Sequence, residues 1–419
     1  MLRQLVAQRG ELRDVINAPV FAFDSPALVA SAGRDDVDLV DALLALGADP
    51  NKRSDWWAGG FHPLYAASGA VAERLLAAGA IPDACAAAQL DRVDLLRQML
   101  ADDPARAHER GGDGQTPLHF ARSRRAVDLL LEAGADVDAR DVDHRSTAAE
   151  WMLGDADNPA KSRVALARYL VERGATADIF LAASLGLTRT ITELLEGDPS
   201  LLELRTGQGP YGEKPPSSYH IYLWTIGAGL TPLQAAARFG QSAAVDVMLP
   251  FATPTQRLLL ACNRGDRAEA HHIVREHPGI VESLKGDDRA ALAAEAWRAN
   301  GKAVVLMMEL GFDPAVPGRA GGGGGTALHC AAWEGSAESV AAILGYPRGR
   351  ALIERRDPHF GGTPFGWCCH GSLNCRNPQG DYAEVARLLI AAGAAIGQGK
   401  VEASAPVLEV ISEARRDGK

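Results

Sequence analysis

The sequence predicts an all-α fold in which about eleven helix pairs stack into a solenoid with loops between them. The first observation is a recurring helix opening, Thr-Pro-Leu-His at 116–119, Thr-Ala-Leu-His at 326–329 and Thr-Pro-Phe at 363–365. The second is a helix that closes on paired aliphatic residues before Gly-Ala, as at 129–135. The third is that the chain is rich in alanine and only 6% of its residues are aromatic, because small side chains let stacked helices approach closely.

Each helix pair carries local signals for its beginning and end. Thr116 can cap the amides of the first turn, and Pro117 at the first helical position sacrifices no hydrogen bond. Residues 128–133 place their apolar side chains on one face, and Gly134 permits the left-handed residue that ends a helix. The aliphatic pairs that close the second helices are anchored at Leu44, Leu76, Leu100, Leu131, Val171, Leu195, Leu249, Val274, Met308, Leu344 and Ile390.

These openings and endings resemble the ankyrin repeat. The resemblance covers nearly all of residues 26–397, with strong matches around Thr116, Thr231, Thr326 and Thr363 and degenerate ones elsewhere. With its short repeats that end in Asp-Pro and its segments at 220–224 and 362–367, the whole chain is similar to a group of long bacterial ankyrin proteins. The resemblance implies protein–protein binding through finger loops and inner helices.

The repeats are irregular in length. Their anchors lie about 24 to about 54 residues apart, against roughly 33 in the ankyrin period. The short steps lack a finger, and their second helices stop at an Asp-Pro or His-Pro pair, as at Asp103, Asp198 and His277. The long steps carry insertions at the finger position, at 51–61, 204–229, 312–325 and 345–362, and two more between paired helices, at 154–162 and 372–380. Long loops in a compact array are more often functional than accidental.

We expect one continuous body made of five parts. These are an N-terminal cap (1–25), N-terminal ankyrin repeats (26–203), an aromatic insertion arm (204–229), C-terminal ankyrin repeats (230–397), and a C-terminal cap and tail (398–419).

The composition argues against several classes of function. The formal net charge is −10, with 43 basic and 53 acidic residues and no long basic run, so we expect no nucleic-acid partner. The six cysteines follow no regular framework, which favours a reducing compartment and therefore the cytoplasm. No stretch approaches the roughly 18 apolar residues of a membrane span, and charges interrupt residues 1–11 before a signal segment could form, so we expect no membrane contact.

One slot of the inner helices carries large side chains in successive repeats. Seven residues before the second-helix valine stand Arg238, Trp297 and Trp333, and His370 occupies the same slot in the last repeat. In the ankyrin pattern this slot faces the concave groove, so the four side chains form a candidate ladder, with Asn263 between the first two. Aromatic faces and a cation could hold a ligand by wide contact and cation–π attraction. The alternative is that the tryptophans only fill gaps between inner helices.

The insertion 204–229 is the second candidate for ligand contact. Its polar first half leads to His220-Ile221-Tyr222-Leu223-Trp224, which predicts a loop ending in an anchored strand or turn. Aromatic residues with polar tips often anchor recognition, although the arm could equally cover a junction in the solenoid. The further candidate contacts are Trp56, Trp57, Tyr219, His220, Tyr222, Trp224 and Trp367.

Motifs for specific chemistry are weak. Gly321 to Gly325 lacks the Lys and hydroxyl residue of a phosphate-binding loop, so it predicts a flexible finger. Cysteines and histidines of two adjacent repeats could suggest zinc, but Cys368 and Cys369 occupy packing slots, so we expect no metal and no cofactor. No spacing singles out a nucleophile and its base. His119 and His329 stand where the repeat usually ties neighbouring fingers by hydrogen bonds.

The sequence therefore predicts a non-enzymatic binding module that recognises a protein or peptide. Its site would be the groove formed by the arm 204–229 and the inner helices of the C-terminal half, with the finger loops beside it. The alternative is an enzyme or a small-molecule-binding protein that uses the same aromatic pocket.

Overall fold

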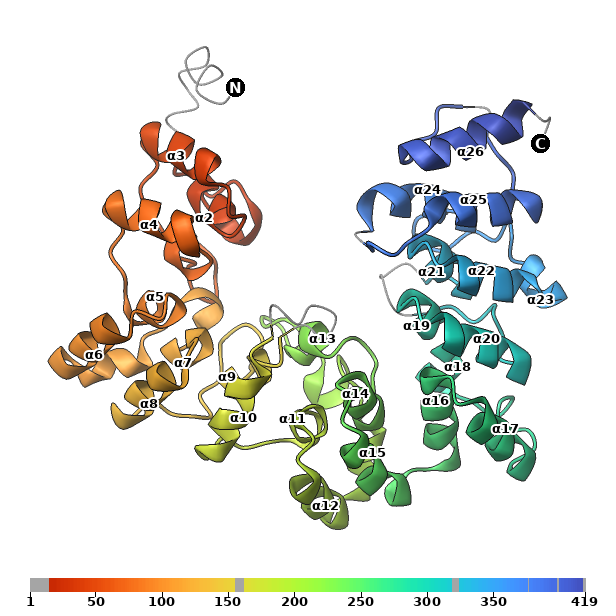
Figure 1. The fold of residues 1–419 in the computed structure, drawn as a ribbon, viewed down its shortest axis with the longest axis horizontal. Helices are drawn as coiled ribbons and strands as arrows, with labels where there is room; N and C mark the ends of the chain where they lie inside the picture. The colour runs from red at the N-terminus through yellow and green to blue at the C-terminus, as the bar shows by residue number, and fades with distance from the viewer. Residues whose placement is uncertain (1–14, 155–161, 319–323, 376, 398, 417–419) are drawn as a thin grey trace. The chain divides into compact units, whose positions relative to one another are not determined.

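A computed structural model describes residues 15–154, 162–318, 324–375, 377–397 and 399–416. Over these residues the chain is all-helical, and its β pairing is limited to three isolated bridges. The chain divides into two compact units, residues 1–247 and 248–419 (Figure 1). Within the described ranges, no helix combines the length and the apolar character that crossing a bilayer requires.

The first unit consists of sequential helix pairs. Helix α7 packs against both α5 and α9, and its partner α8 packs against both α6 and α10. Helix α11 contacts α14 in the same way. The helices are α2 Ala27–Ala32, α3 Val37–Ala45, α4 Gly69–Ala77, α5 Ala84–Gln89, α6 Val93–Asp102, α7 Pro117–Phe120, α8 Arg124–Glu132, α9 Ala148–Trp151, α10 Val164–Glu172, α11 Ile179–Leu185, α12 Thr188–Gly197, α13 Tyr222–Thr225, α14 Pro232–Arg238 and α15 Ser242–Met248.

The second unit repeats this two-row arrangement. Helix α21 lies between α19 and α24, and its partner α22 contacts α20 and α25 (Figure 1). Valines of three successive outer helices, Val304, Val340 and Val385, are completely buried, and each contributes roughly 1.5–3 kcal/mol by leaving water. The helices are α16 Pro254–Arg264, α17 Arg267–Glu276, α18 Gly286–Arg289, α19 Ala291–Trp297, α20 Gly301–Leu310, α21 Ala327–Trp333, α22 Ala337–Leu344, α23 Pro347–Arg350, α24 Pro364–Asn374, α25 Tyr382–Ala391 and α26 Ala405–Arg416.

Threonine is the N-cap residue of α7, α9, α14, α21 and α24. Thr116 caps α7, and its own backbone amide donates a hydrogen bond to the Nδ1 atom of His119. The other ring nitrogen of His119 lies 3.0 Å from the carbonyl oxygen of Ser146, in the next finger. His329 makes the equivalent contact with the carbonyl oxygen of Gly362, at 3.2 Å. The prediction that these histidines tie neighbouring fingers is confirmed.

The helix ends also follow the predicted chemistry. Gly134, directly after the C-cap of α8, has φ +92°, a left-handed conformation that glycine adopts without the steric cost of a Cβ. Helix α6 ends one residue before Asp103-Pro104, and Asp103 accepts a hydrogen bond from the Ala105 amide, starting a short 3-10 helix. The Asp-Pro endings thus stop one helix and cap the next turn.

Several predicted loops and the predicted N-terminal cap fall partly outside the described residues. For the insertion 154–162 this applies to 155–161, and for the glycine-rich finger to 319–323. Of the cap predicted at 1–25, residues 15–25 are described, and they include a 3-10 turn at Ala22–Asp24. At the other end, α26 packs against α25.

Candidate functional site

Three members of the predicted ladder meet in the second unit. Trp297, Trp333 and His370 are each the seventh residue of their helices, α19, α21 and α24. The two indole rings are parallel within 3°, with centroids 6.1 Å apart. The imidazole of His370 lies 5.5 Å from the Trp333 ring. Both tryptophans are half-buried and His370 is exposed, so the three rings form a continuous aromatic surface, here called the aromatic row.

Arg238 holds the same slot, because it is the seventh residue of α14. It is half-buried and belongs to the first unit, so the aromatic row of the second unit consists of the two tryptophans and the histidine. Asn263, expected between Arg238 and Trp297, lies in α16 and donates a hydrogen bond to Glu295, two residues before Trp297.

Trp367 supports the row from beneath. Its side chain is buried, and its ring meets the Trp333 ring edge to face at 6.2 Å. The indole nitrogen donates to the Asp357 carboxylate over 2.9 Å. Because Trp367 is covered, it positions Trp333 and offers little surface to a ligand.

Asp357 holds the finger next to the aromatic row together. Besides the Trp367 indole, its carboxylate accepts hydrogen bonds from the backbone amides of His359, Phe360 and Gly362. Burial alone would raise the pKa of Asp357, but these four donors outweigh it and lower the pKa to about 2. The sequence reasoning considered Asp357 only as a possible acid or base and missed this role.

A second buried carboxylate supports the other end of the row. Glu295 is 1% exposed, and Arg298 donates to one of its oxygens over 3.0 Å. The side-chain amides of Asn263 and Asn300 donate to the other oxygen at 3.0 and 2.7 Å. The carboxylates of Asp357 and Glu295 are therefore already occupied by donors of the protein itself.

The predicted arm folds onto the first unit. Tyr222 is completely buried, and its hydroxyl donates to Asp178 over 2.8 Å. His220 is buried too, with its Nε2 atom 3.4 Å from the Glu150 carboxylate. Tyr219 and Trp224 are 39% and 64% exposed, so these two residues are the arm's accessible aromatics. In the segment predicted as a strand or turn, Tyr222–Thr225 forms a single helical turn, α13, and the Tyr222 ring packs against Phe180.

The arm takes the place of a missing finger. The repeat that starts at α11 has no finger of its own. A hairpin of the arm, closed by the Lys214–Ser217 bridge, lies where that finger would be. The Ser218 amide donates to the backbone carbonyl of Asp143 over 3.0 Å, much as the Val142 amide donates to that of Asp113 over 2.9 Å. The arm therefore extends a row of fingers.

This finger row contains four members. Finger A approaches finger B so closely that a Cβ on Gly59 would lie 2.3 Å from the Gly111 carbonyl oxygen. The Trp56 indole donates to Asp113 of finger B over 3.0 Å, whereas Trp57 is exposed. The members are finger A (51–61), finger B (110–115), finger C (140–147) and the arm hairpin (214–219).

Buried carboxylates concentrate in the finger row. Burial raises the pKa of Asp113 to about 7, and the neighbouring Asp143 and Asp141 add to the increase while His144 opposes it. Burial would also raise the pKa of Glu150, but the hydrogen bond and charge of His220 outweigh it and lower that pKa. Asp113 accepts a hydrogen bond from Trp56 of finger A, and Asp143 accepts one from the Ser218 amide of the arm hairpin, so these two carboxylates hold neighbouring fingers together.

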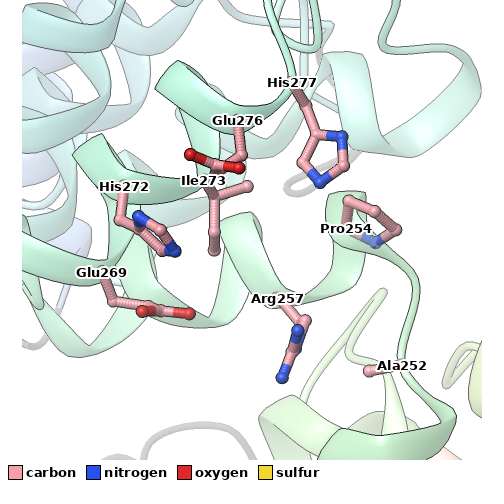
Figure 2. A pocket seen from close by; sticks show the side chains of 8 residues that line it. All are labelled: Ala252, Pro254, Arg257, Glu269, His272, Ile273, Glu276 and His277. Atoms are coloured by element: carbon pink, nitrogen blue, oxygen red, sulfur yellow. The ribbon is translucent and has the colours of Figure 1, made fainter.

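The second unit also has a polar hollow between α16 and α17. Figure 2 shows Arg257 from α16 and Glu269, His272 and Glu276 from α17 around it. Arg257, His272 and Glu276 are exposed, so the hollow is shallow and open to solvent. It lies apart from the residues that the sequence singled out.

Of the cysteines considered for zinc, Cys330, Cys368 and Cys369 lie in the core, and Cys375 is partly exposed. Burial raises the pKa of Cys330 to about 12 and that of Cys369 to about 11, so both thiols stay protonated at neutral pH. In the described part of the chain, His, Cys, Asp and Glu side chains form no group of three arranged to hold a metal ion.

Residues 113–142 match the family model of the ankyrin repeat. The matched segment begins in finger B, includes α7 and α8, and ends in finger C. No curated protein sequence matches the chain.

Proposed function

We propose that the chain binds a protein or peptide partner through the aromatic row, because residues 113–142 match the ankyrin repeat and ankyrin repeats are in general protein-interaction modules. The observation that carries this proposal is the parallel pair Trp297 and Trp333, whose rings remain half-exposed on the seventh position of neighbouring helices. Tryptophans that pack against a core and still offer a face to solvent are the side chains on which binding energy concentrates.

The support beneath the row also favours binding. Trp367, Asp357 and Glu295 are buried and hydrogen-bonded, so they fix the orientation of the surface rings before a partner arrives. A surface that is already ordered loses little side-chain entropy on binding.

The test is affinity capture from a lysate of the source organism, analysed by mass spectrometry for proteins and small molecules. The wild type is compared with the double variant Trp297→Ala/Trp333→Ala and with Phe360→Ala, which removes an exposed aromatic outside the row. We expect the wild type and Phe360→Ala to capture a protein that the double variant does not capture. The helical content should be native in the wild type and in both variants. Retention of the same protein by the double variant would refute the proposal, and recovery of a small molecule alone would favour a ligand pocket.

A further inference from the structure

The indole nitrogens of the aromatic row differ in their hydrogen bonding from those of the other buried or half-buried tryptophans. The buried or half-buried tryptophans elsewhere each donate to an aspartate: Trp56 to Asp113, Trp151 to Asp141 and Trp367 to Asp357. The Nε1 atoms of Trp297 and Trp333 have no acceptor among the described residues, although both rings are half-buried. Since a buried indole N–H normally finds a partner, these two donors are available to a ligand.

His370 adds a third donor. Its Nδ1 atom lies 3.2 Å from the side-chain nitrogen of Asn374, which also donates to the His370 carbonyl oxygen over 2.9 Å. An amide nitrogen can only donate, so Nδ1 accepts and the neutral imidazole carries its hydrogen on Nε2. The exposed edge of His370 therefore also presents an N–H group.

The surface offers donors but few acceptors. Arg298, Asn263 and Asn300 already occupy both oxygens of Glu295. Four donors of the protein occupy the Asp357 carboxylate. A ligand that matches the row must bring hydrogen-bond acceptors on an apolar body, and any N–H groups that it buried there would stay unpaired, which costs free energy.

We propose that the aromatic row binds proline-rich peptide segments in the polyproline II conformation, an inference that rests on the proposed function. In this conformation the backbone has no internal hydrogen bonds, so its carbonyl groups are open to outside donors. Proline lacks the backbone N–H and presents an apolar ring that packs on an aromatic face. Two residues of such a helix rise by about 6.2 Å, which is close to the 6.1 Å between the indole centroids. Because this helix has three residues per turn, residues two apart lie on adjacent edges of it, so two apolar rings at this spacing can pack against the two indoles.

The probe for this proposal is a blocked decaproline peptide, with a blocked Gly-Ser decapeptide of equal length as its control. Binding to the full chain is measured by fluorescence anisotropy of the labelled peptides. The key variant is Trp297→Phe/Trp333→Phe, which keeps two aromatic faces and removes both N–H donors. The matched control is Trp57→Phe, which alters an exposed tryptophan of the first unit. Thermal unfolding followed by circular dichroism establishes that each variant is folded.

We expect decaproline to bind the wild type and Trp57→Phe equally and the Gly-Ser peptide to bind neither. The double phenylalanine variant should bind decaproline about 5- to 100-fold more weakly, as the loss of two hydrogen bonds implies. Absence of decaproline binding, or equal binding by the double variant, would overturn the proposal. If affinity capture still yields a protein that requires Trp297 and Trp333, the proposed function stands and only the ligand class is wrong. If capture fails as well, both are refuted.

Discussion

The hydroxyl of Tyr222 donates a hydrogen bond to the Asp178 carboxylate over 2.8 Å, although 44 residues separate the two in sequence. Asp178 also accepts from the Leu181 amide and so caps α11. Tyr65 bonds Asp83 at the start of α5 in the same way, and Asp83 caps that helix. Both helices lack a finger of their own, so a tyrosine from elsewhere in the chain completes the cap.

Replacing Tyr222 by phenylalanine removes the hydroxyl and keeps the buried ring. We expect the free energy of unfolding to fall by about 1 kcal/mol, the typical value of one buried hydrogen bond, or somewhat more because its partner is a carboxylate. Urea denaturation measures the change. Tyr219→Phe, on the exposed neighbour, should leave the midpoint unchanged, and equal effects of the two substitutions would contradict this account of the cap.

Asp113 should make the first unit sensitive to pH. Its folded-state pKa of about 7 lies above the ordinary value of 3.8, so protonation of this carboxyl favours the folded state. The stabilisation is complete below about pH 4 and is lost as the pH rises towards 7. Asp113→Asn cannot ionise and still offers an acceptor to Trp56. Urea denaturation should show that the variant gains more stability over the wild type at pH 8 than at pH 5, whereas an equal difference at both values would be inconsistent with the raised pKa.

Asp357 should act in the opposite direction. Its folded-state pKa of about 2 lies below the ordinary 3.8, so the ionised carboxylate stabilises the fold above pH 3.8 and this contribution fades as the pH falls towards 2. Asp357→Ala leaves Trp367 and three amides without their acceptor. We expect it to lose about 2–3 kcal/mol at pH 7 and clearly less at pH 2.5. A loss that is the same at both pH values would point to packing and not to charge.

Gly371 sets the closest approach of α24 to α21. A Cβ there would lie 2.5 Å from the Trp333 carbonyl oxygen, so Gly371→Ala must push the two helices apart. We expect a loss of about 1–3 kcal/mol in thermal unfolding, together with weaker partner capture because the row is displaced. In Gly366→Ala, on the same helix, the new Cβ meets only the Thr363 hydroxyl at 3.6 Å. That control should be neutral or gain up to about 1 kcal/mol.

Local signals in the sequence determined much of this fold. Threonine caps, Gly134 and the Asp-Pro endings act within a few residues, so the helix limits could be predicted from them. The common seventh position of Trp297, Trp333 and His370 could be predicted for the same reason, because it depends only on counting along each helix.

Long-range contacts could not be predicted in this way. The burial of Tyr222 and His220 depends on Asp178 and Glu150, and no local pattern states which segment the arm will contact. Trp367 likewise cannot be distinguished from the other tryptophans by local sequence. Its role in positioning the row depends on the hydrogen bond from its indole N–H to the Asp357 carboxylate. One signal could have helped: two of the three repeats without a finger begin with an aspartate, Asp83 or Asp178.

The arm hairpin also links distant stages of chain synthesis. Finger C is complete only when Ser218 and Ile221 have bonded to Asp143 and Ser146, 75 residues earlier in the chain. During synthesis, the finger at 140–147 therefore lacks these partners until residue 221 has left the ribosome. Helices α10, α11 and α12 are available for packing before that. This part of the array should fold later than its position in the sequence suggests, because closing so long a loop comes before its contacts can form.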